Sequence, residues 1–411
     1  MSSAPKAFKP LKPLDDALAE LLGFAQPLGR VESVSTFEAD GRVLAQDLVS
    51  ALQVPPQDNS SMDGYAVRCT DLAAGIALPV LQRIPAGTHG SPLAPMSAAR
   101  IFTGAPIPPG ADAVVMQEDC SVQADGTVRV NAPVQPGQWI RRSGEDVTRG
   151  AVILARGQRL TPAALGLAAS IGLAQVQVAQ RPRVALFSTG DELVMPGEVE
   201  PGQMAPGAIY NSNRFFLKAL LTRLGCEVSD LGIVPDRREA TIEALRGAAQ
   251  GHDLILTSGG VSVGEEDHIK PAVQALGHLD LWQLAIKPGK PFAYGRVAQA
   301  HFIGLPGNPV SSFVTFLLLV RPFLLKLQGV TEVAIKTVAS TADFTWSRAD
   351  KRREFLRVRR RADGGLGLFA NQSSGVLTSA VWGDGLVDNP PGQTIAPGDV
   401  VRFIPFSELL A

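Results

Sequence analysis

The stretch VALFSTGDEL, residues 184–193, and three related stretches decide the fold of this 411-residue chain. The others are DLILTSGGVSVGEED at 253–267, LAIKPGKPF at 284–292 and FIGLPGNPVSS at 302–312. Each joins a short apolar run, typical of a buried strand, to a sharp turn that contains glycine. Ligands of open parallel α/β sheets bind beyond the carboxyl ends of the strands. The four turns therefore predict one ligand site.

The segment around these stretches, residues 182–330, alternates strand and helix patterns. Such alternation predicts a mainly parallel sheet covered by helices on both faces, a three-layer α/β domain. The densest apolar run, residues 313–327, is interrupted by Arg321 and Pro322. It is shorter than a membrane span requires, so we expect a buried core helix.

The chain on either side of this domain divides into further parts. Residues 51–145 are rich in proline and glycine and carry short β-type runs, which predicts an inserted β-rich module. Residues 1–50 and 146–181 frame that module, and the second piece contains a helix pattern capped by Thr161. The tail, residues 331–411, returns to strand patterns with a hairpin signal at Asp363-Gly364, and predicts a small β-barrel or sandwich.

Charge and cysteine content exclude several classes of function. With 38 Lys plus Arg against 39 Asp plus Glu, the net charge is −1, so no overall field attracts nucleic acid or an anionic membrane. Three cysteines without metal-ligand spacing fit a reducing compartment, and the first residues lack the apolar core of a signal peptide. We expect a cytoplasmic protein that binds neither nucleic acid nor membrane.

Two of these turns contain acidic residues and glycines that are typical of a ligand site. Glu192 follows the first strand, and Gly259 and Gly260 precede the acidic residues 265–267. A single surface carboxylate usually only faces solvent. Bare glycine backbone beside several carboxylates instead favours a ligand held with a cation. The glycine run ends in neither a Walker sequence nor a dinucleotide fingerprint, which removes the usual support for nucleotide hydrolases and dehydrogenases.

The remaining two turns offer groups that bind anions. Lys287 and Lys290 flank a Pro-Gly turn, and Asn308 with Pro309 is typical of a helix start. We expect free amides at Val310, Ser311 and Ser312 to bind an oxyanion. Solvated lysines and a rigid turn are the alternative, but they do not explain why four such loops coincide.

These residues resemble the molybdopterin molybdenumtransferases, the family of MoeA and the gephyrin E domain. The similar motifs occur in the family's order over nearly the whole chain: NSSMDGYAV, IFTGAPIPPGADAVV, GEDV, STGDEL, SNRFFL, VPD, TSGGVSVGEEDHIK, LAIKPGKPFAYG, GLPGNPVSS, RREFLRV and NQSSGVLTS. The resemblance implies four domains: an elongated dimerisation domain (1–50 and 146–181), the inserted β module (51–145), the α/β molybdopterin-binding domain (182–330) and a C-terminal β-barrel (331–411).

The resemblance also implies a reaction. Adenylyl-molybdopterin and molybdate would give the molybdenum cofactor and AMP, with Mg²⁺ as the usual divalent metal. It implies a homodimer with its site between subunits. The implied partners are the molybdopterin adenylyltransferase and downstream cofactor-modifying enzymes or molybdoenzymes.

Carried over position by position, the resemblance implies two sets of site residues. The catalytic set is Asp63, Thr103, Asp146, Glu192, Asp236 and Asp267, of which Glu192, Asp236 and Asp267 would serve the metal. The substrate-binding set is Gly259, Gly260, Lys287, Lys290, Pro306, Asn308, Pro309, Ser311, Arg352 and Ser374. Family members often have lysine where this chain has Gln283, and the resemblance leaves open whether Arg352 or Arg353 faces the ligand.

Two other functions remain open from the sequence. A molybdopterin adenylyltransferase has a similar α/β unit but needs none of the surrounding domains. A scaffold of the gephyrin E type would bind peptides without catalysis, and would be expected to lose the acidic and lysine residues that are all present here.

Overall fold

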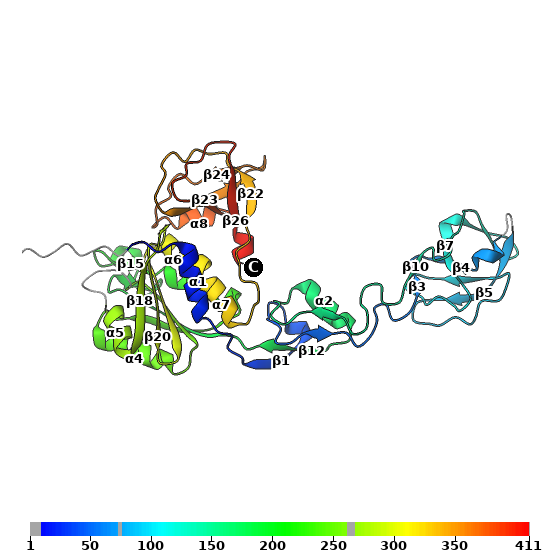
Figure 1. The fold of residues 1–411 in the computed structure, drawn as a ribbon, viewed down its shortest axis with the longest axis horizontal. Coiled ribbons are helices and arrows are strands. Elements are labelled where there is room, and N and C mark those ends of the chain that lie inside the picture. Colours follow the sequence, from blue (N-terminus) through cyan, green and yellow to red (C-terminus); the bar gives the residue numbers. More distant parts are fainter. Residues whose placement is uncertain (1–9, 73–75, 261–267, 411) are drawn as a thin grey trace, which may run out of the picture.

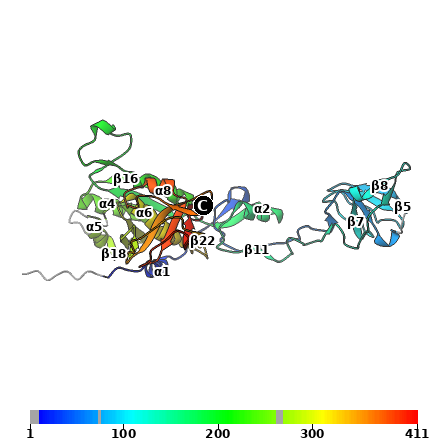
Figure 2. The same ribbon diagram turned by 90° about the horizontal axis from the view of Figure 1, so that it is seen from above.

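The computed structural model describes residues 10–72, 76–260 and 268–410. The molecule is long, with the inserted module at one end and the α/β and C-terminal parts at the other (Figures 1 and 2). A slender middle part joins the two ends. This shape separates residues that the sequence motifs assign to one site.

The α/β part is built on a six-stranded mixed sheet with the order β16-β13-β17-β21-β20-β18. The first four strands of this order are parallel, whereas β20 and β18 run antiparallel to their neighbours. Its strands in chain order are β13 (Arg183–Thr189), β16 (Glu227–Val234), β17 (Leu254–Ser258), β18 (Gly277–Gln283), β20 (Pro291–Val297) and β21 (Ala300–Leu305). The central strands are apolar along their whole length because both faces of the sheet are covered.

Helices cover both faces, which makes three layers. On one face lie α1 (Leu14–Phe24), α3 (Asn213–Arg223), α6 (Pro309–Thr315) and α7 (Arg321–Leu327). On the other lie α4 (Arg238–Ala249) and α5 (Ile269–Leu276). Helix α1 buries Leu14, Ala17 and Leu21 in this core, so it packs with the α/β part although residues 1–50 were predicted to form the elongated domain.

One apolar helix runs without a break from Pro309 to Leu327. A π-helical turn, Phe316–Val320, comes just before Pro322, whose ring and missing N–H would disturb a regular α-helix. Arg321 and Pro322 interrupt the apolar run but not the helix, and the predicted buried core helix is confirmed. By length and composition the helix could cross a membrane, but 89% of it is buried inside the protein, as in a core helix.

The middle part is formed by two distant pieces of chain. Strand β1 (Val31–Ser35) pairs with β12 (Gln175–Ala179), and β2 (Leu48–Val49) pairs with β11 (Val152–Leu154). Helix α2 (Pro162–Ser170) packs beside them, and the hydroxyl of Thr161 accepts a hydrogen bond from the amide of Ala164. The predicted helix cap is confirmed.

The inserted β module contains a six-stranded sheet in the order β7-β4-β6-β5-β9-β8. Its strands are β4 (Gly64–Val67), β5 (Ala77–Ile84), β6 (Ala98–Ile101), β7 (Ala113–Met116), β8 (Cys120–Val122) and β9 (Thr127–Val130), with β3 (Asn59–Ser60) paired to β10 (Ile140–Arg141) at its base. A two-stranded ribbon connects it to the middle part, where Val54 and Val147 exchange backbone hydrogen bonds of 2.8 and 3.1 Å.

The C-terminal part is a curled sheet that forms half of a barrel. Its order is β19-β23-β25-β26-β22, with β24 (Leu366–Leu368) on β23. The strands are β19 (Ile286–Lys287), β22 (Val338–Thr341), β23 (Arg353–Arg360), β25 (Gly385–Asn389) and β26 (Val400–Pro405). The predicted closed β-barrel is not confirmed, because the sheet ends at β19 and β22 and these edges do not pair with each other. The hairpin at Asp363-Gly364 is confirmed by the pairing of β23 with β24.

Candidate active site

The ends of three parallel strands meet at one edge of the α/β sheet. The register pairs Ser188 of β13 with Ser258 of β17, and Ser258 with Leu305 of β21. The amide of Gly259 donates to the carbonyl of Leu305 at 3.1 Å. The turns predicted from the sequence are therefore neighbours in space.

Gly259 and Gly260 are needed for this close approach. Both have positive φ, +93° and +65°, and a Cβ on Gly259 would stand 2.9 Å from the carbonyl oxygen of Thr189. A Cβ on Gly260 would meet the Thr189 hydroxyl at 2.8 Å. Only glycine accommodates both the backbone conformation and the contact.

A pocket of about 650 Å³ lies at this edge. Backbone and small polar side chains make up much of its wall, which suits a polar ligand in a site formed between loops. It is lined by Thr189, Glu192, Leu193, Ile209, Tyr210, Asn211, Ser212, Asn213, Ser258, Gly259, Pro291, Pro306, Gly307, Asn308, Pro309, Ser311 and Gly375. Of the predicted residues, the pocket thus brings together Glu192, Gly259, Pro306, Asn308, Pro309 and Ser311.

Among the predicted acidic residues that the structure describes, Glu192 lines this pocket. Glu192 is exposed and folds back over Gly190, and the neighbouring Asp191 accepts a hydrogen bond from the amide of Asp236 at 3.2 Å. The turns after β13 and β16 are thereby tied together. Asp267 lies outside the described residues. Within those residues no group of three His, Cys, Asp or Glu side chains forms a metal site, so the metal set stays a prediction.

At the start of helix α6, two of the backbone amides that the sequence predicted to be free already donate hydrogen bonds within the protein. The amide of Val310 donates to the carbonyl of Ser374 at 2.9 Å, and the amide of Ser312 donates to the carbonyl of Asn308 at 2.9 Å. The expectation that both are free to bind an oxyanion is wrong, because the C-terminal part accepts the Val310 amide and the first turn of the helix itself accepts the Ser312 amide. Asn308 stands at the cap position, but its side chain makes no capping hydrogen bond.

Lysine and arginine side chains gather where β19 runs beside β23. Lys287 pairs with Glu354 at 3.0 Å and with Asp350 at 3.6 Å. Arg352 also contacts Asp350, at 2.9 Å and 3.1 Å. The turn after Lys287 packs on α6, since a Cβ on Gly289 would lie 2.3 Å from the hydroxyl of Thr315. Lys290, in the same turn, is exposed.

The second arginine of the pair has different partners. Arg353 makes two hydrogen bonds with Asp388, of 2.6 and 2.7 Å, and one of 2.9 Å with Asp15. Arg352 shares a carboxylate with Lys287, whereas Arg353 is held by two other carboxylates. This arrangement favours Arg352 as the arginine on the lysine side.

Three predicted residues lie in or beside the β module, away from the pocket. Asp63 accepts hydrogen bonds from the amide and hydroxyl of Thr103, at 2.8 and 2.7 Å, and these bonds lower the pKa of the Asp63 carboxyl. Asp146 is exposed on the ribbon. Within one chain the β module stands at the opposite end of the molecule from the α/β part (Figures 1 and 2). The structure does not bring these residues to the pocket.

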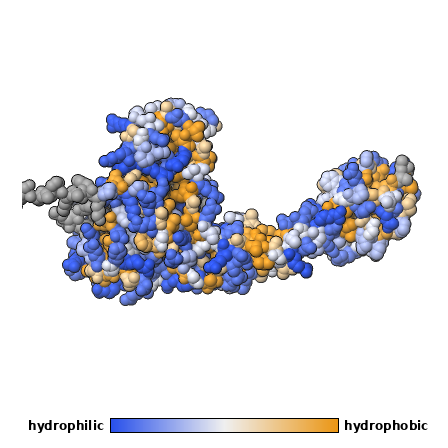
Figure 3. Space-filling view, viewed as in Figure 1, coloured by the Kyte–Doolittle hydropathy of each residue, from blue (hydrophilic) through white to orange (hydrophobic). Residues whose placement is uncertain are grey.

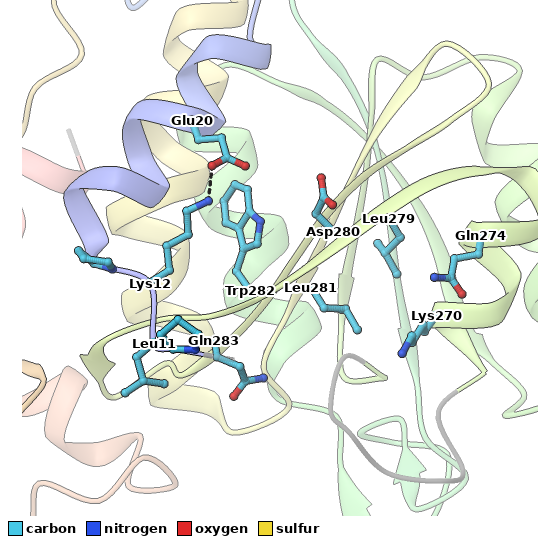
Figure 4. Close-up of a pocket in the computed structure, with 12 residues that line it drawn as sticks. Leu11, Lys12, Glu20, Lys270, Gln274, Leu279, Asp280, Leu281, Trp282 and Gln283 are labelled. Carbon is cyan, nitrogen blue, oxygen red and sulfur yellow. Dashed lines mark hydrogen bonds and ion pairs between the residues drawn. The ribbon is translucent and has the colours of Figure 1, made fainter. Parts of the chain in front are cut away.

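A second pocket, of about 610 Å³, lies along the edge strand β18. Figure 4 shows Gln283 at one end of it and Lys12, which forms an ion pair with Glu20 and lies 4.1 Å from the centre of the Trp282 ring, at its wall. None of the residues predicted for the site lines this pocket.

Comparison with known proteins gives matches along most of the chain. A molybdopterin molybdenumtransferase of Haemophilus influenzae is 46% identical over 317 residues, which cover 77% of this chain and 78% of that protein. The chain belongs to the molybdopterin molybdenumtransferase (MoeA) family. Its members include a protein of that name from Synechococcus elongatus, 41% identical over 307 residues and covering 72% of this chain and 75% of the relative.

Models of three family regions match consecutive segments. They are the MoeA N-terminal region (domain I and II) at residues 12–172, the probable molybdopterin binding domain at 185–326 and the MoeA C-terminal region (domain IV) at 340–406. The crystal structure of a molybdopterin biosynthesis MoeA protein from Pyrococcus horikoshii is similar with a TM-score of 0.83 at 30% identity, over 96% of this chain and 100% of that one. The MoeA fold therefore extends over all parts of the molecule.

The sequence prediction missed several polar residues that line the pocket, among them Asn213 and Ser258. Asn213, at the start of α3, donates to the hydroxyl of Ser258 and the carbonyl of Gly307, both at 2.7 Å. It thus ties the ends of β17 and β21 together. An asparagine before an amphipathic helix is typical of a helix cap, so no local signal in the sequence distinguishes this long-range role.

Proposed function

We propose that the chain is a molybdopterin molybdenumtransferase, which converts adenylyl-molybdopterin and molybdate into molybdenum-bound molybdopterin and AMP. The observation that carries this is the strand-end pocket with its glycine backbone, in a chain that matches the MoeA family along its length. The turn that bears Lys287 and Lys290 leads directly to Pro291 of the pocket wall. The two alternatives are not favoured. An adenylyltransferase would not need the flanking regions, and a scaffold would not need the charged residues.

Under this proposal, the charged side chains bind the anion and the glycine turns contact the rest of the ligand. Lys287, Lys290 and Arg352 hold the molybdate anion by charge-assisted hydrogen bonds. The glycine turns let the ligand approach the backbone at Gly259 and Gly260. Holding the anion next to its acceptor supplies the proximity contribution to the rate.

Mg²⁺ is the divalent ion that we propose for this site. Exposed oxygen donors such as Glu192, next to the linked turns of Asp191 and Asp236, suit a hard cation. When bound, the metal would offset negative charge on the pyrophosphate. Asp267 completes the proposed set.

We also propose a homodimer, in which the β module of one subunit completes the pocket of the other. The middle part supports this. Figure 3 shows hydrophobic surface over it, where Pro162, Ala163, Gly166 and Ala169 of α2 are exposed and Phe37 is 93% exposed. An apolar helix face of this kind is normally covered by another surface. Asp63 and Thr103 would then reach a pocket that they do not reach within one chain.

The setting of the reaction is likewise a proposal. We propose a cytoplasmic enzyme that receives its substrate from the molybdopterin adenylyltransferase and delivers its product to cofactor-modifying enzymes or molybdoenzymes. The near-zero net charge supports the absence of nucleic acid among its partners.

Release of AMP from adenylyl-molybdopterin by the purified protein tests the proposal. We expect AMP only when molybdate and Mg²⁺ are both present, and equal release without molybdate would contradict the assignment. Glu192→Gln should lower the rate about 100-fold or more by weakening metal binding. The matched control is Glu200→Gln, an exposed carboxylate in the same loop region, which should leave the rate unchanged.

A further inference from the structure

The cations predicted to bind the oxyanion already share a carboxylate of the protein. Asp350 lies 3.6 Å from the ammonium of Lys287 and accepts hydrogen bonds of 3.1 and 2.9 Å from the guanidinium of Arg352. It also accepts the backbone amide of Arg352 at 3.0 Å. Two cations thus converge on one side chain, as they would on a bound oxyanion.

The other carboxylate of the cluster, Glu354, is more deeply buried than Asp350 and has other partners besides Lys287. Glu354 is 1% exposed and fixed by Lys287 at 3.0 Å and by the indole N–H of Trp346 at 2.7 Å. The side chain of Asp350 is 21% exposed, and within the described residues the partners of its carboxylate are Lys287 and Arg352. Moving Glu354 would leave the partly buried indole N–H of Trp346 without its acceptor, whereas Asp350 can turn toward water. Asp350 is therefore the replaceable carboxylate.

The charges of this cluster cancel. Lys287 and Arg352 face Asp350 and Glu354, so an approaching anion meets little net positive charge. Hydrogen bonds from the Arg352 side chain hold the pKa of Asp350 well below its usual range, so it is ionised at neutral pH. A bound anion gains the full field of the two cations only if Asp350 leaves.

We propose that Asp350 is an internal counter-ion which occupies the oxyanion position and is displaced when molybdate binds. This inference rests on the proposed function, because that function assigns Lys287 and Arg352 to molybdate. A tethered carboxylate is always present at high effective concentration. Weakly bound monoanions such as chloride are therefore excluded, and a dianion that binds both cations strongly is admitted.

Calorimetric titration of the full-length protein with sodium molybdate tests the proposal. Asp350→Asn removes the competing charge but keeps an oxygen for the Arg352 amide, and should bind molybdate about tenfold more tightly than the wild type. Asp350→Ser, which lacks both the charge and the reach, should do the same. The matched control is Asp343→Asn, which removes a partly exposed carboxylate paired with Arg361 in the same domain and should not change the affinity.

Unchanged or weaker binding by both Asp350 variants would overturn the proposal and make Asp350 a support for Arg352. Wild-type protein that binds molybdate in the titration, and that releases AMP only with molybdate and Mg²⁺ in the assay described under the proposed function, leaves that function intact. Absence of molybdate binding in the wild type and in both Asp350 variants would overturn the proposed function and the counter-ion together.

Discussion

Asn213 shows how one buried amide organises the pocket. It is 8% exposed, and its two donated hydrogen bonds hold the Ser258 hydroxyl and the Gly307 carbonyl. Loops beyond strand ends have little regular hydrogen bonding of their own, so such a link fixes their spacing. The shape of the pocket therefore depends on a side chain that belongs to a helix.

Replacement of Asn213 should destabilise the protein even when its size is kept. Asn213→Asp presents an acceptor to the Gly307 carbonyl and should lower the free energy of unfolding by about 1–3 kcal/mol, as should Asn213→Ala. Urea denaturation measures this change. Stability equal to the wild type in Asn213→Asp would show that the two hydrogen bonds do not hold the loops.

His301 is a buried titratable group in the core of the α/β part. It is 7% exposed, its Nδ1 lies 2.9 Å from the Tyr294 hydroxyl, and burial lowers its pKa to about 4. The unfolded chain takes up the proton near pH 6.5. Because the unfolded state binds more protons between these values, the stability that neutral His301 contributes is present above pH 6.5 and is lost as the pH falls toward 4.

Stability measurements over this range should reveal the histidine. We expect the wild type to lose up to about 1.4 kcal/mol per pH unit below pH 6.5 from this group. His301→Asn keeps an acceptor for Tyr294 and does not titrate, so its stability should fall less steeply over the same range. Parallel pH profiles for the two proteins would contradict the assignment.

The turn after β17 depends on its backbone more than on side chains. Gly259 has φ +93° and lies against the Thr189 carbonyl, whereas a Cβ on Gly307 would find its nearest atom at 3.9 Å, an ordinary contact. Both glycines line the same pocket. Alanine substitution at each of them therefore separates the effect of backbone strain from the effect of a side chain in the pocket.

Gly259→Ala should cost about 1–3 kcal/mol of stability, because alanine is strained at this φ and its Cβ clashes with β13. Gly307→Ala should change stability by less than about 0.5 kcal/mol. Thermal and urea denaturation of both variants provide the measurement. Equal loss in the two variants would remove the conformational explanation.

The whole molecule keeps its predicted catalytic residues at two ends. Asp63 and Thr103 lie on the β module, and Glu192 lies at the α/β pocket (Figure 1). In a symmetric dimer the same surface patches meet in both subunits, so each pocket can receive the partner's module. The proposed dimer then has two equivalent composite sites.

Mixing two inactive variants tests this arrangement. Asp63→Asn and Glu192→Gln should each be inactive alone, but a mixture that is allowed to exchange subunits should recover about a quarter of wild-type activity, since half the dimers carry one intact site. The control mixes two separate preparations of Asp63→Asn in the same way, and should remain inactive. No recovery in a mixture with proven subunit exchange would place both residues in the same chain's site.

Local sequence patterns predicted most of the secondary structure of the α/β part, but fewer of the contacts that form the site. The runs in β13, β17 and β21 are recognisable because strands buried on both faces are apolar throughout. The open edge of the C-terminal sheet was not predictable, because closure depends on pairing between distant strands. The occupied Val310 amide was missed for a similar reason, since its acceptor, Ser374, comes from another domain.

The ribbon at Val54 and Val147 makes the β module separable. The chain leaves the middle part and returns to it through adjacent segments that are joined by hydrogen bonds, so the two crossing points lie close together. Insertions with neighbouring ends are tolerated because the host fold needs only a short connection in their place. We therefore expect that the module can be excised, or replaced by that of a relative, without unfolding the rest of the molecule.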